Sequence, residues 1–232
     1  MQGSVRPIAI ATLEHERRGY RLAKRVFDVV VAGGLLILLA PVFACCAVAV
    51  RLSSRGPIIF RQTRVGEGGR HFTFLKFRSM YAAADQAPHQ EYVKAFIRGE
   101  AAQHRARRQA KHRIPLYKLG NDARITPIGR WLRHTSLDEL PQLWNVLRGD
   151  MSLVGPRPPI PYELEYYRPE QLGRLAVRPG ITGLWQVSGR SRTTFDEMVA
   201  LDLDYIRRQS FLLDLRILLR TVPTVLLGKD AR

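Results

Sequence analysis

Cysteine is scarce in this chain, because the only two among 232 residues, Cys45 and Cys46, are adjacent. Neighbouring cysteines inside an apolar run suit neither a structural disulfide nor a zinc site, so we interpret both as small buried apolar residues. Acidic residues are also few, with 20 Asp and Glu against 37 Lys and Arg and a formal charge of +17. That charge favours polyanionic partners, namely nucleic acid, anionic lipid or phosphorylated substrates, without choosing among them.

Several patterns that announce a function or a modular organisation are missing. The sequence has no paired-histidine metal motif, no Gly-x-Ser-x-Gly elbow, no cysteine–histidine signature, no internal repeat and no low-complexity linker. The glycines at 66–69 are not followed by the Lys and Ser or Thr of a phosphate-cradling loop. Aromatic residues are not interleaved with the basic ones as a base-stacking platform requires, so we expect no nucleic-acid partner. The length favours one core plus an anchor.

One apolar segment, Val29 to Val50, runs for 22 residues without a charge. That is about the ~20 residues a helix needs to cross a bilayer, so the segment predicts membrane contact. Pro41 near its middle removes a helix hydrogen bond, and Gly33 and Gly34 loosen the first half. The first 25 residues hold six basic against two acidic residues and the rest of the chain is basic too, which opposes placing either flank outside. These features favour a re-entrant helix–break–helix over a kinked span.

The remaining chain predicts a small hairpin and several helices. Residues 58–77 are typical of a β-hairpin with its turn at 66–69. The segment 82–113 is compatible with a helix and becomes densely basic after residue 104, either as a solvated face or as a contact with anionic lipid. Residues 195–208 predict an amphipathic helix. Residues 211–227 are apolar but interrupted by charges and Pro223, which fits a helix lying in the membrane interface or one packed in the domain.

Residues 136–148 give the strongest helical pattern, with Ser136 as the expected N-cap and Gly149 as the end. Asp138 and Glu139 then fall in the first turn, where an N-cap and the helix dipole favour acids on structural grounds alone. The alternative is chemical: an ionised carboxylate can attack phosphorus, and guanidinium groups such as Arg133 and Arg157 can neutralise phosphate oxygens. An adjacent acid can also help to hold Mg²⁺. The residues alone leave both readings open.

Six ordered stretches of unusual polar, glycine and proline residues carry a resemblance to a known family: Lys24–Asp28 before the apolar run, Arg64–Gly66 with Lys76–Met80, Arg124–Gly129, Ser136–Asn145, Val154–Pro158, and Arg178–Gly183 with Gln186 and Arg190. From Lys24 to the C-terminus the chain resembles the bacterial sugar transferases, the monotopic polyprenyl-phosphate phosphoglycosyl transferases, and among them the compact exopolysaccharide-initiating type. Two departures are Ala40, where many members have Ser before the proline, and a basic insert at 82–118.

The resemblance implies an α/β, mostly helical, monotopic membrane protein with a re-entrant anchor, a small β-hairpin and amphipathic interfacial helices. Its expected parts are a basic segment 1–23, an anchor 24–55 and a cytoplasmic catalytic domain 56–232. The implied activity is transfer of a sugar 1-phosphate, galactose or glucose, from a UDP-sugar to undecaprenyl phosphate at the cytoplasmic face of the bacterial inner membrane. This would start exopolysaccharide or other glycoconjugate synthesis. Membrane lipids and a second copy in a homodimer are further expected partners. The competing reading is a non-enzymatic basic scaffold at a membrane surface.

The resemblance also assigns roles to individual residues. Asp138 would be the nucleophile that carries the phospho-sugar, Glu139 its partner, and both would hold Mg²⁺. Phosphate contacts would come from Arg133 and Arg157. The remaining implied residues lie at the membrane interface and acceptor, Lys24, Arg25 and Pro41, and in a loop for the nucleotide sugar, Gly180, Thr182, Gly183, Gln186 and Arg190.

Overall fold

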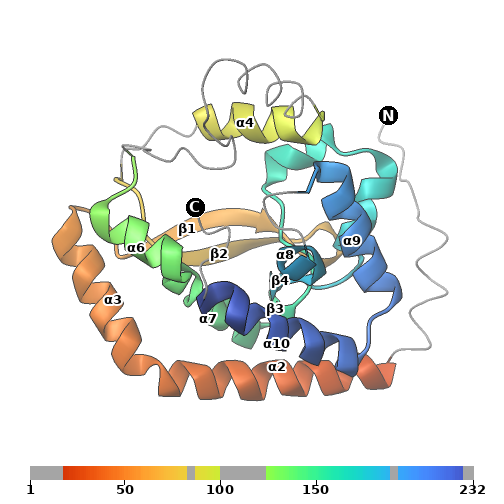
Figure 1. Ribbon diagram of the computed structural model, residues 1–232, viewed down its shortest axis with the longest axis horizontal. Coiled ribbons are helices and arrows are strands. Elements are labelled where there is room, and N and C mark those ends of the chain that lie inside the picture. The colour runs from red at the N-terminus through yellow and green to blue at the C-terminus, as the bar shows by residue number, and fades with distance from the viewer. Residues whose placement is uncertain (1–17, 83–86, 100–123, 189–192, 227–232) are drawn as a thin grey trace.

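Two long helices joined at a sharp bend form the N-terminal part of the protein. The computed structural model describes residues 18–82, 87–99, 124–188 and 193–226. Helix α2 (Arg18–Leu38) runs along the lower edge of Figure 1 and α3 (Ala40–Ser53) rises from its end. In the part of the chain described, no single helix meets the length and hydropathy of a membrane span, whereas α2 and α3 meet them together, bent by 63°.

The bend lies where the sequence predicts it. Leu39 leaves helical geometry at φ −91°, ψ 7°, and Pro41 follows in the first turn of α3. Because Pro41 has no N–H, the carbonyl four residues earlier, on Ile37, cannot receive a helical hydrogen bond from it. Bonds from Leu39 to Leu35 and from Phe43 to Leu39 continue on either side, so the proline interrupts the ladder locally. Helix α2 begins at Arg18, before the expected anchor start at Lys24.

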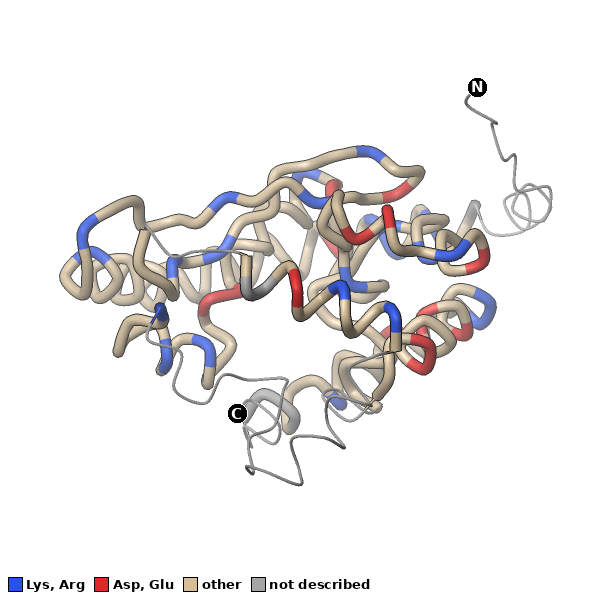
Figure 2. Tube along the Cα trace, turned by 90° about the horizontal axis from the view of Figure 1, so that it is seen from above, with Lys and Arg blue, Asp and Glu red and all other residues tan. Residues whose placement is uncertain are grey.

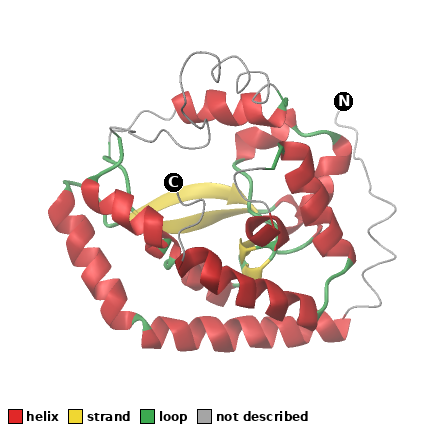
Figure 3. Ribbon diagram, viewed as in Figure 1, coloured by secondary structure: helices red, strands yellow, loops and turns green. Residues whose placement is uncertain are grey.

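The predicted hairpin is confirmed and crosses the middle of the molecule (Figures 1 and 3). Strands β1 (Ile59–Val65) and β2 (His71–Phe77) pair antiparallel in register from one end to the other. A short 3₁₀ turn, η1 (Glu67–Gly69), connects them, and Gly68 and Gly69 adopt φ of 66° and 80°, which side chains with a Cβ disfavour. The glycines therefore make the turn, as the sequence indicates.

The two ends of the segment between the hairpin and residue 125 lie side by side. Met80 bridges Ile125, and Tyr81 donates a backbone hydrogen bond to the Arg124 carbonyl. Within that segment, α4 (Ala87–Ile97) packs on α9 (Phe195–Arg207) and on the 3₁₀ segment η3 (Pro161–Tyr166), along the upper edge of Figure 1. The predicted helix at 82–113 is thus confirmed for residues 87–97. Its basic run at 105–113 lies outside the described residues.

The predicted helix at 136–148 is wrong in its first half. Helix α6 (Pro127–Thr135) ends at Ser136, a 3₁₀ turn η2 (Leu137–Glu139) follows, and α7 (Gln142–Arg148) begins only after Pro141. Pro141 cannot donate to the Leu137 carbonyl, and its ring opposes a continuous helix through that point. Ser136 makes no side-chain cap, whereas Gly149 ends α7 at φ 89° as predicted.

The C-terminal half surrounds a second, parallel strand pair. Strand β3 (Ser152–Val154) pairs with β4 (Gly180–Thr182), and two 3₁₀ segments, η3 (Pro161–Tyr166) and η4 (Pro169–Ala176), link them. Helices α8 (Leu184–Ser188), α9 (Phe195–Arg207) and α10 (Phe211–Leu226) complete the chain, which confirms the two predicted C-terminal helices. The described protein is mostly helical with two small sheets, as Figure 3 shows.

One buried cluster packs helix α2 against the strands and the C-terminal helices. Buried apolar side chains from α2, β2, α7, β3, α9 and α10 form a single cluster: Ala32, Phe74, Leu143, Val146, Met151, Leu153, Val154, Tyr205 and Ile217. The Asp28 carboxylate, 1% exposed, accepts a hydrogen bond from the Leu153 amide. Helix α2 therefore packs into the domain on one face while Val30 and Ile37 remain 66% and 80% exposed on another.

Candidate active site

The two acids singled out by the sequence lie in a tight turn between α6 and α7. Thr126 caps α6 by accepting a hydrogen bond from the Gly129 amide at 2.9 Å. At the other end Ser136 takes a left-handed conformation, φ 58°, ψ 14°, the one positive φ of a non-glycine residue in the described ranges. Such a conformation costs about 1–2 kcal/mol and persists where the surrounding structure imposes it, often at functional sites. It reverses the chain so that Asp138 and Glu139 follow in η2.

A lysine from the hairpin joins the two carboxylates. The Lys76 ammonium lies 2.7 Å from Glu139 Oε1 and 3.6 Å from Asp138 Oδ2. The same ammonium nitrogen lies over the Phe74 ring, 5.6 Å from the ring centroid. Asp138 is 5% exposed, and the side chains of Lys76 and Glu139 are 18% and 25% exposed. The cluster of Asp138, Glu139 and Lys76 is thus mostly buried but reachable from solvent through Glu139 and Lys76.

The environment shifts the pKa values of the Asp138 and Glu139 carboxyl groups in opposite directions. Burial raises the pKa of the Asp138 carboxyl, the charge on Glu139 adds to the rise, and Lys76 and Arg133 partly offset it. Burial also acts to raise the pKa of Glu139, but Lys76 and Arg157 together outweigh it, so that pKa falls below its ordinary value. Glu139 is therefore held as a carboxylate. The raised pKa of Asp138 means that its ionised oxygen is more basic than an ordinary carboxylate, and a more basic oxygen is a better nucleophile.

Guanidinium groups from three elements flank this cluster. Arg133 lies in the last turn of α6, and its charge lowers the pKa of Asp138. Arg157 follows β3, and its charge lowers the pKa of Glu139. Arg64 in β1 is 7% exposed, and its burial together with the neighbouring charge of Arg157 lowers its pKa to about 10. It donates to the Pro158 carbonyl at 2.8 Å, which ties the chain beside Arg157 to the hairpin. The charges of Arg133 and Arg157 thus reach Asp138 and Glu139, and the roles of all four residues in binding and transferring phosphate stay predictions.

Sequence reasoning did not assign a role to Lys76 or Arg64. A signal for Lys76 exists, because period-two alternation in β2 puts it on the same strand face as Phe72 and Phe74. A charged side chain on an otherwise aromatic face needs a partner of opposite charge. The hydrogen bond of Arg64 to Pro158, in contrast, joins residues 94 apart and depends on tertiary packing.

The two basic residues expected at the membrane interface have partners inside the protein. Lys24 forms an ion pair with Asp214 of α10 at 2.8 Å. Arg25 donates to the last carbonyls of α7, Val146 O at 2.5 Å and Leu147 O at 2.7 Å, and so caps that helix. Both residues fix α2 to the domain that carries the acids.

Pro41, the third of this set, lines an apolar pocket of about 340 Å³ between α3 and α6. The other lining residues are Val42, Cys45, Cys46, Ala49 and Trp131. Trp131 is 53% exposed and precedes Arg133 on α6 by two residues. An apolar pocket therefore opens next to the helix that carries a candidate phosphate ligand.

The expected nucleotide-sugar loop packs against the segment that carries Arg157. A Cβ on Gly180 would lie 2.1 Å from the Gly155 amide nitrogen, and one on Gly183 would lie 2.4 Å from the Gly155 carbonyl. These two glycines allow β4 to approach Gly155 closely. Thr182 shares a 2.8 Å hydrogen bond with Thr221, and Gln186 donates to the Ile181 carbonyl. Arg190 lies outside the described residues.

Asp138 and Glu139 supply two neighbouring carboxylates beside the Lys76 ammonium. Within the residues that the structure describes, no group of three or more His, Cys, Asp or Glu side chains is placed to hold a metal ion. Magnesium at phosphate-transfer sites is commonly bound through one or two carboxylates and completed by substrate phosphates and water. Asp138 and Glu139 fit that arrangement, with the Lys76 ammonium competing for the same oxygens.

The comparison with known proteins shows the family of this chain. The family model described as bacterial sugar transferase matches residues 19–228. The exopolysaccharide production protein ExoY of Rhizobium meliloti is 39% identical over 229 residues, which cover 99% of this chain and 92% of that protein. A protein of Caulobacter vibrioides named UDP-glucose:undecaprenyl-phosphate glucose-1-phosphate transferase is 44% identical, covering 90% of this chain and 72% of the relative.

A longer relative shows the same relationship. The galactosyl transferase CpsE of Streptococcus agalactiae is 42% identical over 95% of this chain, which spans only 46% of that protein's length. With most of its length matched, this chain belongs to the bacterial sugar transferase family. The predicted membership and the prediction of a transferase enzyme are confirmed.

Proposed function

We propose that this protein transfers a sugar 1-phosphate from a UDP-sugar to undecaprenyl phosphate through a covalent intermediate on Asp138. The observation that carries the proposal is the buried cluster of Asp138, Glu139 and Lys76, flanked by arginines, in a member of the sugar transferase family. Two relatives at 41% and 44% identity are named undecaprenyl-phosphate galactose phosphotransferase and a glucose-1-phosphate transferase. We therefore propose a hexose, galactose or glucose, as the transferred sugar.

In the first step a carboxylate oxygen of Asp138 attacks the phosphorus that bears the sugar. The new Asp138–phosphorus bond forms as the bond from that phosphorus to the bridging oxygen of the diphosphate breaks. The nucleoside monophosphate leaves with the electron pair of the broken bond. Arg133 and Arg157 neutralise the charge of the phosphate oxygens, which would otherwise repel the attacking anion. Lys76 stabilises the ionised form of Asp138 before attack.

In the second step an oxygen of undecaprenyl phosphate attacks the same phosphorus. The Asp138–phosphorus bond breaks, the carboxylate is regenerated, and the product is a lipid diphosphate sugar. Glu139 stays ionised throughout, since Lys76 and Arg157 outweigh the effect of its burial. Magnesium held by Asp138, Glu139 and the diphosphate would supply further charge neutralisation. Holding both substrates at one nucleophile removes much of the entropic barrier to their meeting.

The acceptor is a lipid, so we propose that the anchor fixes the site at a membrane surface. Helices α2 and α3 form the bent apolar pair, and basic positions spread over the rest of the described trace in Figure 2. A re-entrant arrangement keeps both basic flanks on the cytoplasmic face of the inner membrane, in agreement with the positive-inside tendency. The apolar pocket at Pro41 and Trp131 offers a place for the acceptor's hydrocarbon near Arg133. The name ExoY supports a role in starting exopolysaccharide synthesis.

The test is release of nucleoside monophosphate from UDP-galactose or UDP-glucose in the presence of undecaprenyl phosphate and Mg²⁺. Asp138→Asn is expected to reduce release at least about 10³-fold, because an amide is not a nucleophile for phosphorus. Asp196→Asn is the matched control, since the Asp196 side chain is 63% exposed and pairs with Arg168, not with the cluster of Asp138, Glu139 and Lys76. A basic membrane scaffold would release none in either form, and full activity of Asp138→Asn would remove the proposed intermediate. Supplying UDP-galactose and UDP-glucose in separate reactions identifies the donor.

A further inference from the structure

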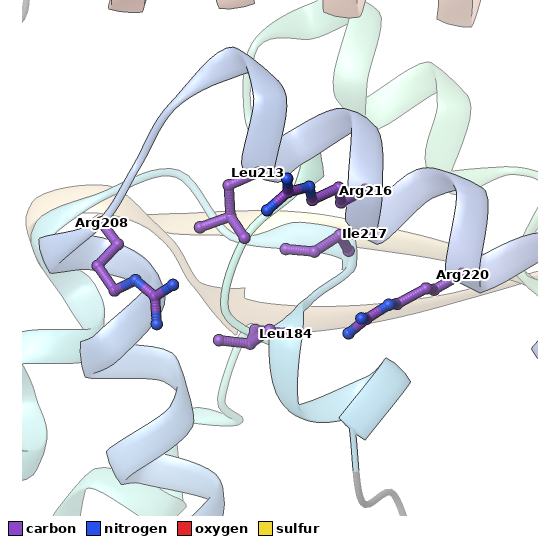
Figure 4. A pocket seen from close by; sticks show the side chains of 6 residues that line it. All are labelled: Leu184, Arg208, Leu213, Arg216, Ile217 and Arg220. Carbon is purple, nitrogen blue, oxygen red and sulfur yellow. The ribbon is translucent and has the colours of Figure 1, made fainter.

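A second pocket, formed by α8, α9 and α10, is lined by three arginines. It has a volume of about 210 Å³, with Arg208, Arg216 and Arg220 around it and Leu184, Leu213 and Ile217 as its apolar part. Figure 4 shows the side chains of Arg216 and Arg220 extending from α10, and that of Arg208 extending from α9, around the space above Leu184. The pocket shares no lining residue with the cluster at Asp138.

Two of the acidic residues on the helices that form this pocket are Asp204 and Asp214. Asp204 accepts from Arg208 at 3.1 Å and also lies 3.7 Å from Arg207, so one carboxylate serves two guanidinium groups. Asp214, the acid on α10 nearest in sequence, is 2% exposed and bonded to Lys24, Tyr20 and Tyr205 on the inner side of the helix. Arg216 and Arg220 are exposed. An anion in the pocket would meet the guanidinium groups of Arg208, Arg216 and Arg220, whose donors suit phosphate oxygens.

The size and floor of the pocket limit the kind of anion. Sites that enclose a whole small-molecule ligand are usually about 300–1,000 Å³, so this pocket is too small for an entire nucleotide sugar. Three apolar side chains, one of them Ile217 at 1% exposure, form part of its wall and favour a ligand with a hydrocarbon portion. A phosphate group joined to apolar chains meets both conditions.

An apolar surface begins next to the arginines on the same helix. The large exposed apolar side chains of α10 recur at helical spacing along one stripe: Phe211, Leu212, Leu215, Leu219 and Val222. At 100° per residue, Arg216 and Arg220 fall on the edge of that stripe, between it and the buried face. Helix α10 lies beside α2, through Phe27 against Phe211, and α2 exposes apolar side chains of its own. The arginines thus border the exposed apolar stripe of α10.

We propose that this pocket binds the phosphate of an anionic phospholipid, whose acyl chains lie along the exposed stripe of α10. The guanidinium groups of Arg208, Arg216 and Arg220 hold the phosphate, and their stems lie along the apolar surface at the depth of the headgroups. The site is separate from the transfer chemistry at Asp138 and anchors the C-terminal helix to one class of lipid.

The test measures thermal unfolding of the full chain in a neutral detergent. Short-chain phosphatidylglycerol is compared with the matching phosphatidylcholine and with inorganic phosphate at equal concentration. At tenfold excess over its dissociation constant, a ligand specific for the folded state raises the Tm of a protein of this size by about 3–6 °C. We expect that rise with phosphatidylglycerol alone.

Substitutions test whether the rise in Tm with phosphatidylglycerol comes from binding in this pocket. Arg216→Gln with Arg220→Gln is expected to abolish it, whereas Arg61→Gln with Arg70→Gln removes the same charge from the exposed hairpin and should preserve it. If the first pair lowers the Tm without ligand, each single variant is measured, and each should reduce the rise. An equal rise with inorganic phosphate, a rise that survives loss of both α10 arginines, or equal loss in the hairpin pair would overturn the proposal.

Discussion

Replacement of Lys76 by methionine tests how the active-site charges work. The Lys76 ammonium lies 3.6 Å from Asp138 Oδ2, and at an effective dielectric constant of about 20 this attraction amounts to at most about 4–5 kcal/mol. Partial exposure of the lysine, 18%, reduces that value through solvent screening. Methionine keeps much of the volume over Phe74 and removes the charge. The carboxylate form of Asp138 is then left with Arg133 as its chief counter-charge.

The expected result is a change in the pH dependence of kcat/KM. Burial already raises the Asp138 pKa, and activity that needs its ionised form is present above that pKa and lost as the pH falls through it. Removing Lys76 raises the pKa further, so the acidic limb of the profile moves to higher pH. At pH 7 the loss in kcat/KM should be on the order of 10²-fold, and it should narrow as the pH rises and Asp138 ionises again.

The assay is nucleoside monophosphate release between about pH 5.5 and about 9, below the ordinary pKa of lysine. The unchanged protein is measured in parallel, because the acceptor's phosphate monoester itself ionises at about pH 6. Lys94→Met is the matched control, because Lys94 also lies over an aromatic ring, at 5.5 Å from the Tyr166 centroid, but on α4. Its profile should equal that of the unchanged protein. A Lys76→Met profile with the original acidic limb and a uniformly lower rate would refute the electrostatic role.

Two further substitutions test packing that positions the site. Asp202→Asn should lower the free energy of unfolding by about 3–5 kcal/mol and the Tm by about 6–20 °C. The reason is that Arg174, 3% exposed and 2.7 Å from Asp202, loses its buried counter-charge. A loss below about 1 kcal/mol would contradict this. Gly155→Ala should lower both Tm and activity, because its Cβ would lie 2.4 Å from the Arg178 carbonyl, whereas Gly34→Ala meets no atom within 4 Å and should unfold like the original protein. Equal effects of the two alanines, measured by thermal unfolding, would contradict the close approach of β4.

Local patterns predicted the elements whose causes are local. The hairpin follows from alternating side chains and turn glycines, and the bend before α3 follows from Pro41. The helix expected at 136–148 was wrong because the leucine spacing and the serine–glutamate pattern resemble a capped helix, while Pro141 prevents one. The left-handed Ser136 therefore could not be anticipated from the periodicity.

Sequence patterns do not predict contacts between residues that lie far apart in the chain. Lys76 and Glu139 are 63 residues apart, and their contact requires the hairpin register and the η2 turn together. The prediction for Lys24 and Arg25 is a place at the membrane interface and acceptor. Their contacts with Asp214 and with the α7 carbonyls depend on where α10 and α7 pack, which the sequence does not show. Family resemblance assigned Asp138 and Glu139, and the structure adds the charges that set their pKa values.

The most direct measurement of the central claim is the mass of the protein after incubation with its UDP-sugar and Mg²⁺ in the absence of undecaprenyl phosphate. We expect a covalent adduct with the mass of a hexose phosphate, located on the peptide that contains Asp138. The adduct should disappear when undecaprenyl phosphate is added, because the acceptor releases it in the second step. Absence of an adduct from a sample that releases nucleoside monophosphate once acceptor is present, or an adduct on a different residue, would contradict the account.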